Sequence, residues 1–335
     1  MILIVSKQML EITTEEVIDW IYYLGHSFIR INGEDIYNDK SINVSFLDNK
    51  GIVIHKKKLN SSNNKVDISS KEFNIGWYRR WSDNFSFLSL SDYELNNQMY
   101  DSILRVLRTE EVTLKNYFLN SIHVKKWLSK PSRSNVNKLI VLDKAKSLGL
   151  RIPKSIICSG KKQLTKFIHK YENIITKALC VGLTYQDSKS TIYNFTERVN
   201  KYDLDTIPTK FPPTLFQEMI SKQYEIRTFY LDGAFYSMCI FSQLDHQTST
   251  DFRVYNNAKP NRTVPYKLPK ELEDRLKALM DELDLETGSI DLIKGIDGNY
   301  YFLEVNPVGQ FGMTSYPCNY YLERKVAEYL TKHDF

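Results

Sequence analysis

The chain has 335 residues, of which 42% are hydrophobic and 25% charged, and its formal net charge is +5. This length allows two or three domains with full hydrophobic cores, and the composition is typical of a globular protein. The opening apolar run is too short and uncharged for a signal peptide and no run approaches a membrane span, so we expect a cytoplasmic protein that is not bound to a membrane.

Residues 1–130 are predicted to form an N-terminal α/β domain. Two apolar strands, Ile2–Val5 and Ser27–Ile31, flank an amphipathic helix whose start is marked by a capping box of Thr13 and Glu16. Short β segments and one long helix follow, until a stretch rich in Pro, Ser and Asn interrupts every periodicity. We place the first domain boundary at this interruption.

Residues 131–213 are predicted to form a second region of mixed helices and strands. Its strand Ile174–Leu179 is largely apolar but contains Lys177. A lysine in an apolar strand costs free energy unless an anion lies beside it. Lys177 is therefore a candidate ligand of a negatively charged group.

The third region, residues 214–335, contains a β-hairpin around Asp297-Gly298, the kind of dipeptide that most strongly indicates a turn. A two-residue turn there places Asp291 directly opposite Glu304, with Asn306 two residues further along the same face. Like charges placed opposite each other destabilise a sheet, which favours a bound cation over a surface hairpin with solvated acids. Two carboxylates and an amide oxygen suit Mg²⁺, which can also hold nucleotide phosphates.

Other site chemistries are not indicated by the sequence. The four cysteines are widely spaced and the six histidines show no ligand spacing, which argues against zinc, iron–sulfur and disulfide frameworks. Basic pairs such as Arg79-Arg80 and Lys125-Lys126 could attract an anionic ligand or an acidic peptide. No nucleic-acid motif accompanies them, so we expect no nucleic-acid partner.

Short motifs in the second and third regions occur in the order found in ATP-grasp enzymes. They are Lys138, Ile-Ile-Thr-Lys177, Phe-Gln-Glu218-Met-Ile220, Tyr-Glu225-Ile-Arg227, Asp251-Phe-Arg253, Asp291 and Phe-Leu-Glu304-Val-Asn306-Pro. The chain thus resembles an ATP-grasp carboxylate ligase over about residues 137–335. The resemblance implies an N-terminal α/β domain followed by two α+β subdomains, 131–213 and 214–335, that clasp ATP.

The resemblance also implies which residues bind the cofactors. Those that would bind ATP are Lys138, Lys177, Gln217, Glu218, Met219, Ile220 and Glu225. Those that would hold Mg²⁺, or Mn²⁺ in its place, are Asp291, Glu304 and Asn306.

Each implied role has a physical basis in the residue type. The two lysines would approach the phosphates and the adenine edge, the backbone of Gln217–Ile220 would read adenine, and Glu225 would bind the ribose hydroxyls. Arg227 and Arg253 would contact the γ-phosphate and the reacting carboxyl group, because planar guanidinium forks suit bidentate binding. The segment after Lys177 lacks the glycine-rich loop of many relatives, so Thr184–Thr191 could serve as a lid instead.

A narrower resemblance involves the ligases that cross-link ribosomally made peptides, the graspetide or microviridin type. It rests on Phe-Leu-Glu-Val-Asn-Pro-Val-Gly-Gln-Phe near the C-terminus. Two further segments, Trp-Tyr-Arg-Arg and Pro-Cys-Asn-Tyr-Tyr-Leu-Glu, are similar to the grasp-with-spasm branch, which is encoded beside a radical SPASM maturase. The implied partners are a precursor peptide, with a leader and an acidic, hydroxyl-rich core, and that maturase. Whether the protein forms a homodimer is left open by the sequence.

The implied reaction is phosphorylation of a substrate Asp or Glu side chain, followed by attack of a Ser or Thr hydroxyl or a Lys amine to close a macrocyclic ester or amide. Two alternatives share the nucleotide site. One is an ATP-grasp ligase that acts on a small carboxylic acid or adds amino acids to a protein. The other is a non-catalytic protein that binds ATP or peptide.

Overall fold

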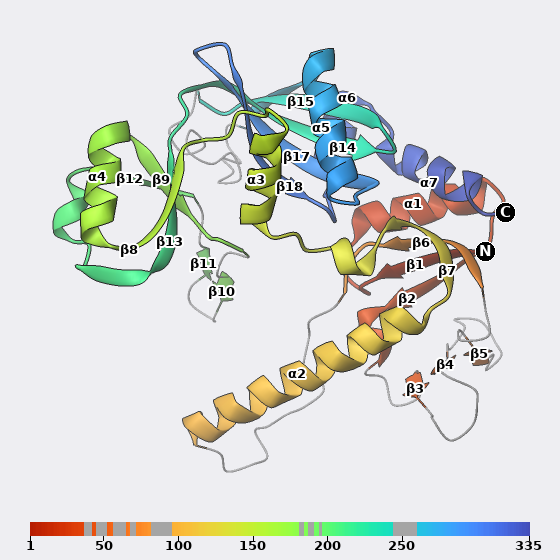
Figure 1. Ribbon diagram of the computed structural model, residues 1–335. Coiled ribbons are helices and arrows are strands. Elements are labelled where there is room, and N and C mark those ends of the chain that lie inside the picture. Colours follow the sequence, from red (N-terminus) through yellow and green to blue (C-terminus); the bar gives the residue numbers. More distant parts are fainter. Residues whose placement is uncertain are drawn as a thin grey trace. The chain divides into compact units, whose positions relative to one another are not determined.

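The computed structural model (Figure 1) describes residues 1–36, 42–44, 52–55, 65–67, 72–81, 96–180, 184–186, 191–193, 196–243 and 260–335. The chain divides into two compact units, residues 1–134 with 322–335, and residues 135–321. The division near residues 130 and 213 stays a prediction. The last helix, which the sequence analysis assigns to residues 214–335, belongs instead to the first unit. None of the described helices is long and apolar enough to cross a membrane.

The first unit is built on a parallel four-stranded sheet in the order β2-β1-β6-β7. Its strands are β1 (Ile2–Ser6), β2 (Phe28–Asn32), β6 (Phe73–Tyr78) and β7 (Val124–Ser129). Every residue of β1 is buried, as expected for a central parallel strand covered on both faces. A separate antiparallel sheet contains β3 (Ile42–Val44), β4 (Ile52–His55) and β5 (Lys65–Asp67).

Helices pack on both faces of the parallel sheet. On one face α1 (Ile12–Tyr23) lies beside α7 (Leu322–Lys332), and the end of α2 (Asn97–Ser121) packs with Leu3 and Val5 on the other. The predicted start of α1 is wrong. The helix begins at Ile12, because the residue before it is Glu11, whose backbone carbonyl accepts the first helical hydrogen bonds from Thr14 and Glu15.

The C-terminal segment is held in the first unit by apolar packing and by polar contacts of Asp334. One face of α7 is buried, including Leu322, Val326 and Leu330. Asp334 then pairs with the amino group of Met1 and with His26 and Asn74. Burial alone would raise the pKa of the Asp334 carboxyl group, but these hydrogen bonds lower it below its usual value.

Truncating the buried face of α7 tests this packing. Leu330 is fully buried, so Leu330→Ala removes apolar contacts and leaves a cavity; we expect the free energy of unfolding to fall by about 2–5 kcal/mol. Leu10→Ala removes the same atoms from a residue that is 85% exposed and should change stability by less than about 0.5 kcal/mol. Equal losses in the two variants, measured by chemical denaturation, would contradict the assignment of α7 to the core.

The second unit contains two antiparallel sheets. The first has the order β12-β9-β13-β8 and is covered by α4 (Lys161–Tyr171), whose Leu164, Phe167 and Ile168 pack on it. Its strands are β8 (Ser155–Gly160), β9 (Ile174–Lys177), β12 (Glu197–Val199) and β13 (Lys210–Glu218). A two-stranded hairpin of β10 (Thr184–Gln186) and β11 (Thr191–Tyr193) belongs to the same region of the chain.

The other sheet has five strands in the order β16-β15-β14-β17-β18. They are β14 (Lys222–Leu231), β15 (Ala234–Phe241), β16 (Arg262–Tyr266), β17 (Thr287–Gly295) and β18 (Tyr300–Asn306). Helices α3 (Lys138–Ser147) and α5 (Lys270–Glu282) cover its apolar face with Val141, Leu276 and Leu279. Helix α6 (Gly312–Cys318) packs with Met238 and Ile240 on the opposite face.

The predicted two-residue turn between β17 and β18 is wrong, although the pairing it implies is confirmed. Gly295 accepts from the N–H of Gly298 and donates to Asn299, so the loop has three residues, and Gly298 takes the positive φ of 78° that this turn requires. The longer loop shifts the register by one residue. A bulge at Leu303 shifts it back, so that Asp291 lies opposite Glu304.

Candidate functional site

The five-stranded sheet carries charged residues on the face opposite to α3 and α5. Side chains alternate along each strand, so Ile226 on β14 and Leu292 on β17 point into the core. Glu225 and Arg227 on β14 and Asp291 on β17 then share the other face. The sheet thus brings together charged residues from neighbouring strands.

Arg227 forms an ion pair with Asp291, its direct neighbour across β14 and β17. Nη1 of Arg227 lies 2.9 and 3.0 Å from the two carboxylate oxygens. Both side chains are buried, at 9% and 14% exposure. Nε of Arg227 is buried as well and has no hydrogen-bond partner within the described part of the chain.

Lys138 holds the second carboxylate of the predicted metal site. It is the first residue of α3, and its Nζ lies 2.9 Å from a carboxylate oxygen of Glu304 and 3.4 Å from the carbonyl oxygen of Ala178. The repulsion expected between Asp291 and Glu304 is therefore offset by two side-chain cations, one on each carboxylate. Opposing acids in this hairpin do not by themselves require a metal ion.

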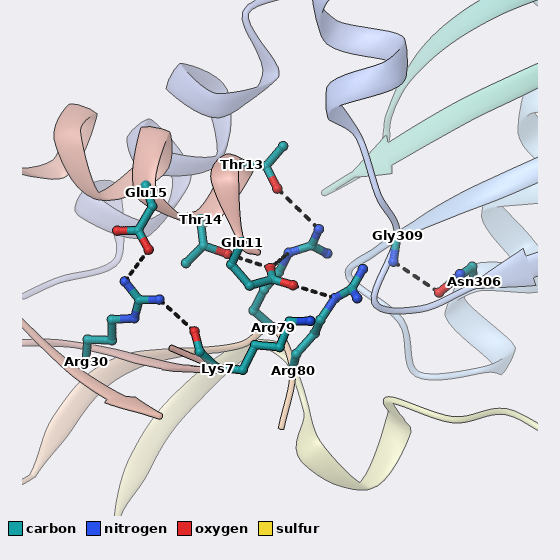
Figure 2. Close-up of polar contacts among 10 residues, drawn as sticks. All are labelled: Lys7, Glu11, Thr13, Thr14, Glu15, Arg30, Arg79, Arg80, Asn306 and Gly309. Atoms are coloured by element: carbon teal, nitrogen blue, oxygen red, sulfur yellow. Dashed lines mark hydrogen bonds and ion pairs between the residues drawn. The ribbon is translucent and has the colours of Figure 1, made fainter. Parts of the chain in front are cut away.

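The predicted metal ligands nevertheless present a donor set that fits Mg²⁺. Asp291 and Glu304 lie opposite each other, and Asn306 follows on β18, opposite Ser289. Figure 2 shows that Oδ1 of Asn306 accepts a hydrogen bond of 3.2 Å from the backbone N–H of Gly309, which fixes the amide. Carboxylate and amide oxygens are hard ligands, so these three residues could hold Mg²⁺ if the two cations move aside.

The predicted adenine hinge follows β13, and most of its donors are already engaged. The N–H groups of Glu218 and Met219 donate to the carbonyl oxygens of Lys154, at 2.8 Å, and Asn173, at 2.9 Å. Ile220 makes no backbone hydrogen bond through its N–H to any described residue. Of the three, its N–H is therefore the donor that could read a base.

Gln217, the first residue of this hinge, and Glu225 on β14 are both buried. Gln217 is 1% exposed and donates to Oγ of Ser155 at 2.8 Å, while its Oε1 has no partner among the described residues. Glu225 pairs with Lys222 and accepts from Ser242 at 2.6 Å, both through Oε1. Lys222 was missed by the sequence analysis; an oppositely charged residue three positions before Glu225 was the available signal.

The remaining predicted residues are placed less completely. Lys177 is the last residue of β9, opposite Leu215 on β13, and is half-buried. Arg253 lies outside the described residues, as does the connection within the expected lid at Thr184–Thr191, although the strands at both ends of that segment pair as a hairpin.

A cavity of about 680 Å³ is lined in part by the hinge residue Glu218. It is also bordered by α3, by Lys154 and the start of β8, and by Tyr301. Lys177, Arg227, Asp291 and Glu304 are not part of its lining.

Comparison with known proteins places this geometry in a fold. No family model and no curated protein match the chain. A RiPP-associated ATP-grasp ligase of Chryseobacterium gregarium, in complex with ADP and a leader and core peptide, matches 100% of this chain and 98% of its own, at 25% identity and a TM-score of 0.80.

Two further solved structures match over nearly the whole length. The macrocyclase MdnC of Microcystis aeruginosa MRC, bound with the precursor peptide MdnA, covers 99% of both chains at 25% identity and a TM-score of 0.78. The ATP-grasp ligase PsnB, complexed with Mg and ADP, covers 99% of this chain and 98% of its own at 16% identity and a TM-score of 0.72, a likeness of fold alone.

The chain has the ATP-grasp fold, a parallel α/β sheet in one unit and two antiparallel sheets in the other. This confirms the predicted fold class. The two solved structures at 25% identity are a RiPP-associated ATP-grasp ligase and a macrocyclase.

Removing the guanidinium group of Arg227 tests the buried ion pair. Arg227→Met removes the Arg227 cation from the largely buried carboxylate of Asp291, so we expect the free energy of unfolding to fall by about 3 kcal/mol. The control Arg275→Met breaks an exposed pair with Glu271 and should cost at most about 1 kcal/mol. Denaturation curves in the absence of nucleotide measure both. A loss no larger than that of the control would contradict a structural role for the pair.

Proposed function

We propose that this ATP-grasp ligase binds ATP and Mg²⁺ on the charged face of the five-stranded sheet and cross-links a ribosomally made precursor peptide. The observation that carries the proposal is the pairing of Asp291 with Glu304, two acids that face each other between Arg227 and Lys138. The solved relatives at 25% identity hold ADP or a precursor peptide, which supports the same nucleotide and substrate class here.

The reaction proceeds in two balanced steps. A carboxylate oxygen of a substrate Asp or Glu attacks the γ-phosphorus of ATP, and ADP leaves. A Ser or Thr hydroxyl, or a Lys amine, of the same peptide then attacks the acyl carbon of the mixed anhydride, loses its proton and displaces phosphate. Each ring formed therefore removes one water from the peptide, as an ester or an amide.

The chain itself supplies positioning and charge for these steps. Arg227 has a buried Nε without a partner among the described residues, which suits it to bind the γ-phosphate or the reacting carboxyl group. We propose the same contact for Arg253. Lys138 and Lys177 are proposed to bind phosphate oxygens, the hinge Gln217–Ile220 to read adenine, and Glu225 to accept from the ribose through Oε2.

Mg²⁺ held by Asp291, Glu304 and Asn306 would neutralise charge on the transferred phosphate group. Lys138 and Arg227 contact the two carboxylates in the structure, so both side chains would have to leave them for a divalent cation to be held there. Their freed positive charges can then pair with ATP and substrate. Nucleotide and metal are in this way expected to bind together, because each supplies the charge that the other leaves uncompensated.

The partner proposals extend beyond the nucleotide. We propose a precursor with a leader and an acidic, hydroxyl-rich core, and membership of the grasp-with-spasm branch with its radical SPASM maturase. The motif Trp-Tyr-Arg-Arg, which spans the end of β6, and the segment Pro-Cys-Asn-Tyr-Tyr-Leu-Glu, which runs from the end of α6 to the start of α7, support this branch. A ligase for small carboxylic acids is the second candidate, since it shares the nucleotide site.

Glu304→Gln separates catalysis from folding. The Lys138–Glu304 pair is partly exposed, so its loss should lower stability by no more than about 1 kcal/mol. Removal of a metal ligand should nevertheless abolish water loss from a co-expressed precursor, measured by mass spectrometry. Full cyclisation by this variant would refute the metal assignment, and turnover of a free small acid without any peptide product would favour the second candidate.

A thermal-shift assay tests the nucleotide site. ATP with Mg²⁺ should raise the melting temperature of the wild-type chain by mass action, and Lys177→Ala should remove most of that rise. Lys162→Ala, on the exposed part of α4, removes the same charge from the same region and should keep the full shift. An undiminished shift in Lys177→Ala would show that this lysine does not bind nucleotide.

A further inference from the structure

The parallel sheet of the first unit has a switch point, where its chain connections turn to opposite sides. Its chain runs from β1 through α1 to β2 on one side, whereas β6 pairs with β1 on the other side. β1 and β6 are therefore adjacent parallel strands, and the chain segments that leave their carboxyl ends run in different directions. Ligands of open α/β sheets bind at such switch points. Here the two connections begin at Lys7 and Arg79.

Two arginines and one glutamate meet at this point, as Figure 2 shows. Glu11 lies 3.5 Å from Nε of Arg79 through one carboxylate oxygen and 2.8 Å from Nε of Arg80 through the other. The side chains of Arg79 and Glu11 are both 2% exposed. Among the described residues, two guanidinium groups thus share one buried carboxylate, and the three ionised groups together carry one net positive charge.

The excess charge persists at neutral pH. Burial, together with the nearby charge of Arg80, lowers the pKa of the Arg79 guanidinium to about 10, against the attraction of Glu11. Arg79 therefore stays protonated at pH 7. Glu11 immediately precedes α1 but makes no side-chain capping bond to the helix, so its carboxylate serves the arginines and Thr14 instead.

Arg80 presents this charge outward. Its side chain is 30% exposed, and its Nε faces Glu11. The two terminal amino groups of Arg80 donate no hydrogen bond to any described residue, which leaves a planar fork of donors beside the carboxyl end of β6. A guanidinium fork matches the two oxygens of a carboxylate.

We infer that Arg80, supported by Arg79 and Glu11, binds a carboxylate side chain of an acidic peptide. A singly charged carboxylate neutralises the one excess charge, whereas a dianionic phosphate would leave a negative charge beside the buried Glu11. The inference rests on the proposed function, because a precursor rich in Asp and Glu supplies such groups. This contact would add binding energy from a part of the peptide that does not react.

The test measures binding of a fluorescein-labelled peptide of alternating Glu and Thr to the full chain, with its Gln–Thr counterpart as the uncharged reference. We expect Arg80→Gln to raise Kd for the Glu peptide about tenfold, which corresponds to about 1.4 kcal/mol. Arg80→Lys keeps the charge but lacks the fork, and should raise Kd by a smaller factor. Arg324→Gln, which removes an exposed arginine of α7 paired with Glu328, should leave Kd unchanged.

A second measurement reports on the residue itself. The Glu peptide, but not the Gln peptide, should protect Arg80 from phenylglyoxal modification, quantified by mass spectrometry of the wild-type chain. Equal Kd values for wild type and Arg80→Gln, or no protection of Arg80, would overturn the inference. The wild-type measurement stands even where a variant fails to fold.

Failure of this site and failure of the proposed function give different results. Water loss from a precursor is measured in parallel with the wild-type chain. Protection of Arg80 without any water loss would contradict the cross-linking function and keep the carboxylate site. Normal water loss without protection of Arg80 would keep the function and overturn the site.

Discussion

The charged face of the second unit depends on neutralisation of two carboxylates that the hairpin forces together. Asp291 and Glu304 face each other across β17 and β18, and each has its own cation, Arg227 from β14 and Lys138 from α3. Because the two cations come from different elements, the same electrostatic requirement ties the helix α3 to the sheet. The acids that make the site chemically useful therefore also determine which elements must lie around it.

Much of this arrangement could be predicted from the sequence. Alternation along the hairpin put Asp291, Glu304 and Asn306 on one face, and the ordered motifs indicated the fold that the solved structures confirm. Both inferences use local patterns, in which side-chain direction follows from residue spacing. Such patterns survive changes elsewhere in the chain.

The parts that could not be predicted depend on contacts between distant residues. Spacing alone does not reveal that Arg227 binds Asp291, 64 residues later, or that Lys154 takes the hinge N–H of Glu218. The start of α1 was misplaced for a related reason. A capping box is a local signal, but Glu11 is drawn to arginines that follow β6, and the helix begins beside it.

Because of the bulge at Leu303, the length of the hairpin loop determines which side chains of β18 face those of β17. A three-residue loop alone would displace the pairing by one position, and the bulge restores it. Insertion or deletion of a single residue on either side therefore turns Glu304 away from Asp291 unless a second length change compensates. A chimaera that exchanges this loop between ligases must therefore exchange the loop and the bulge together.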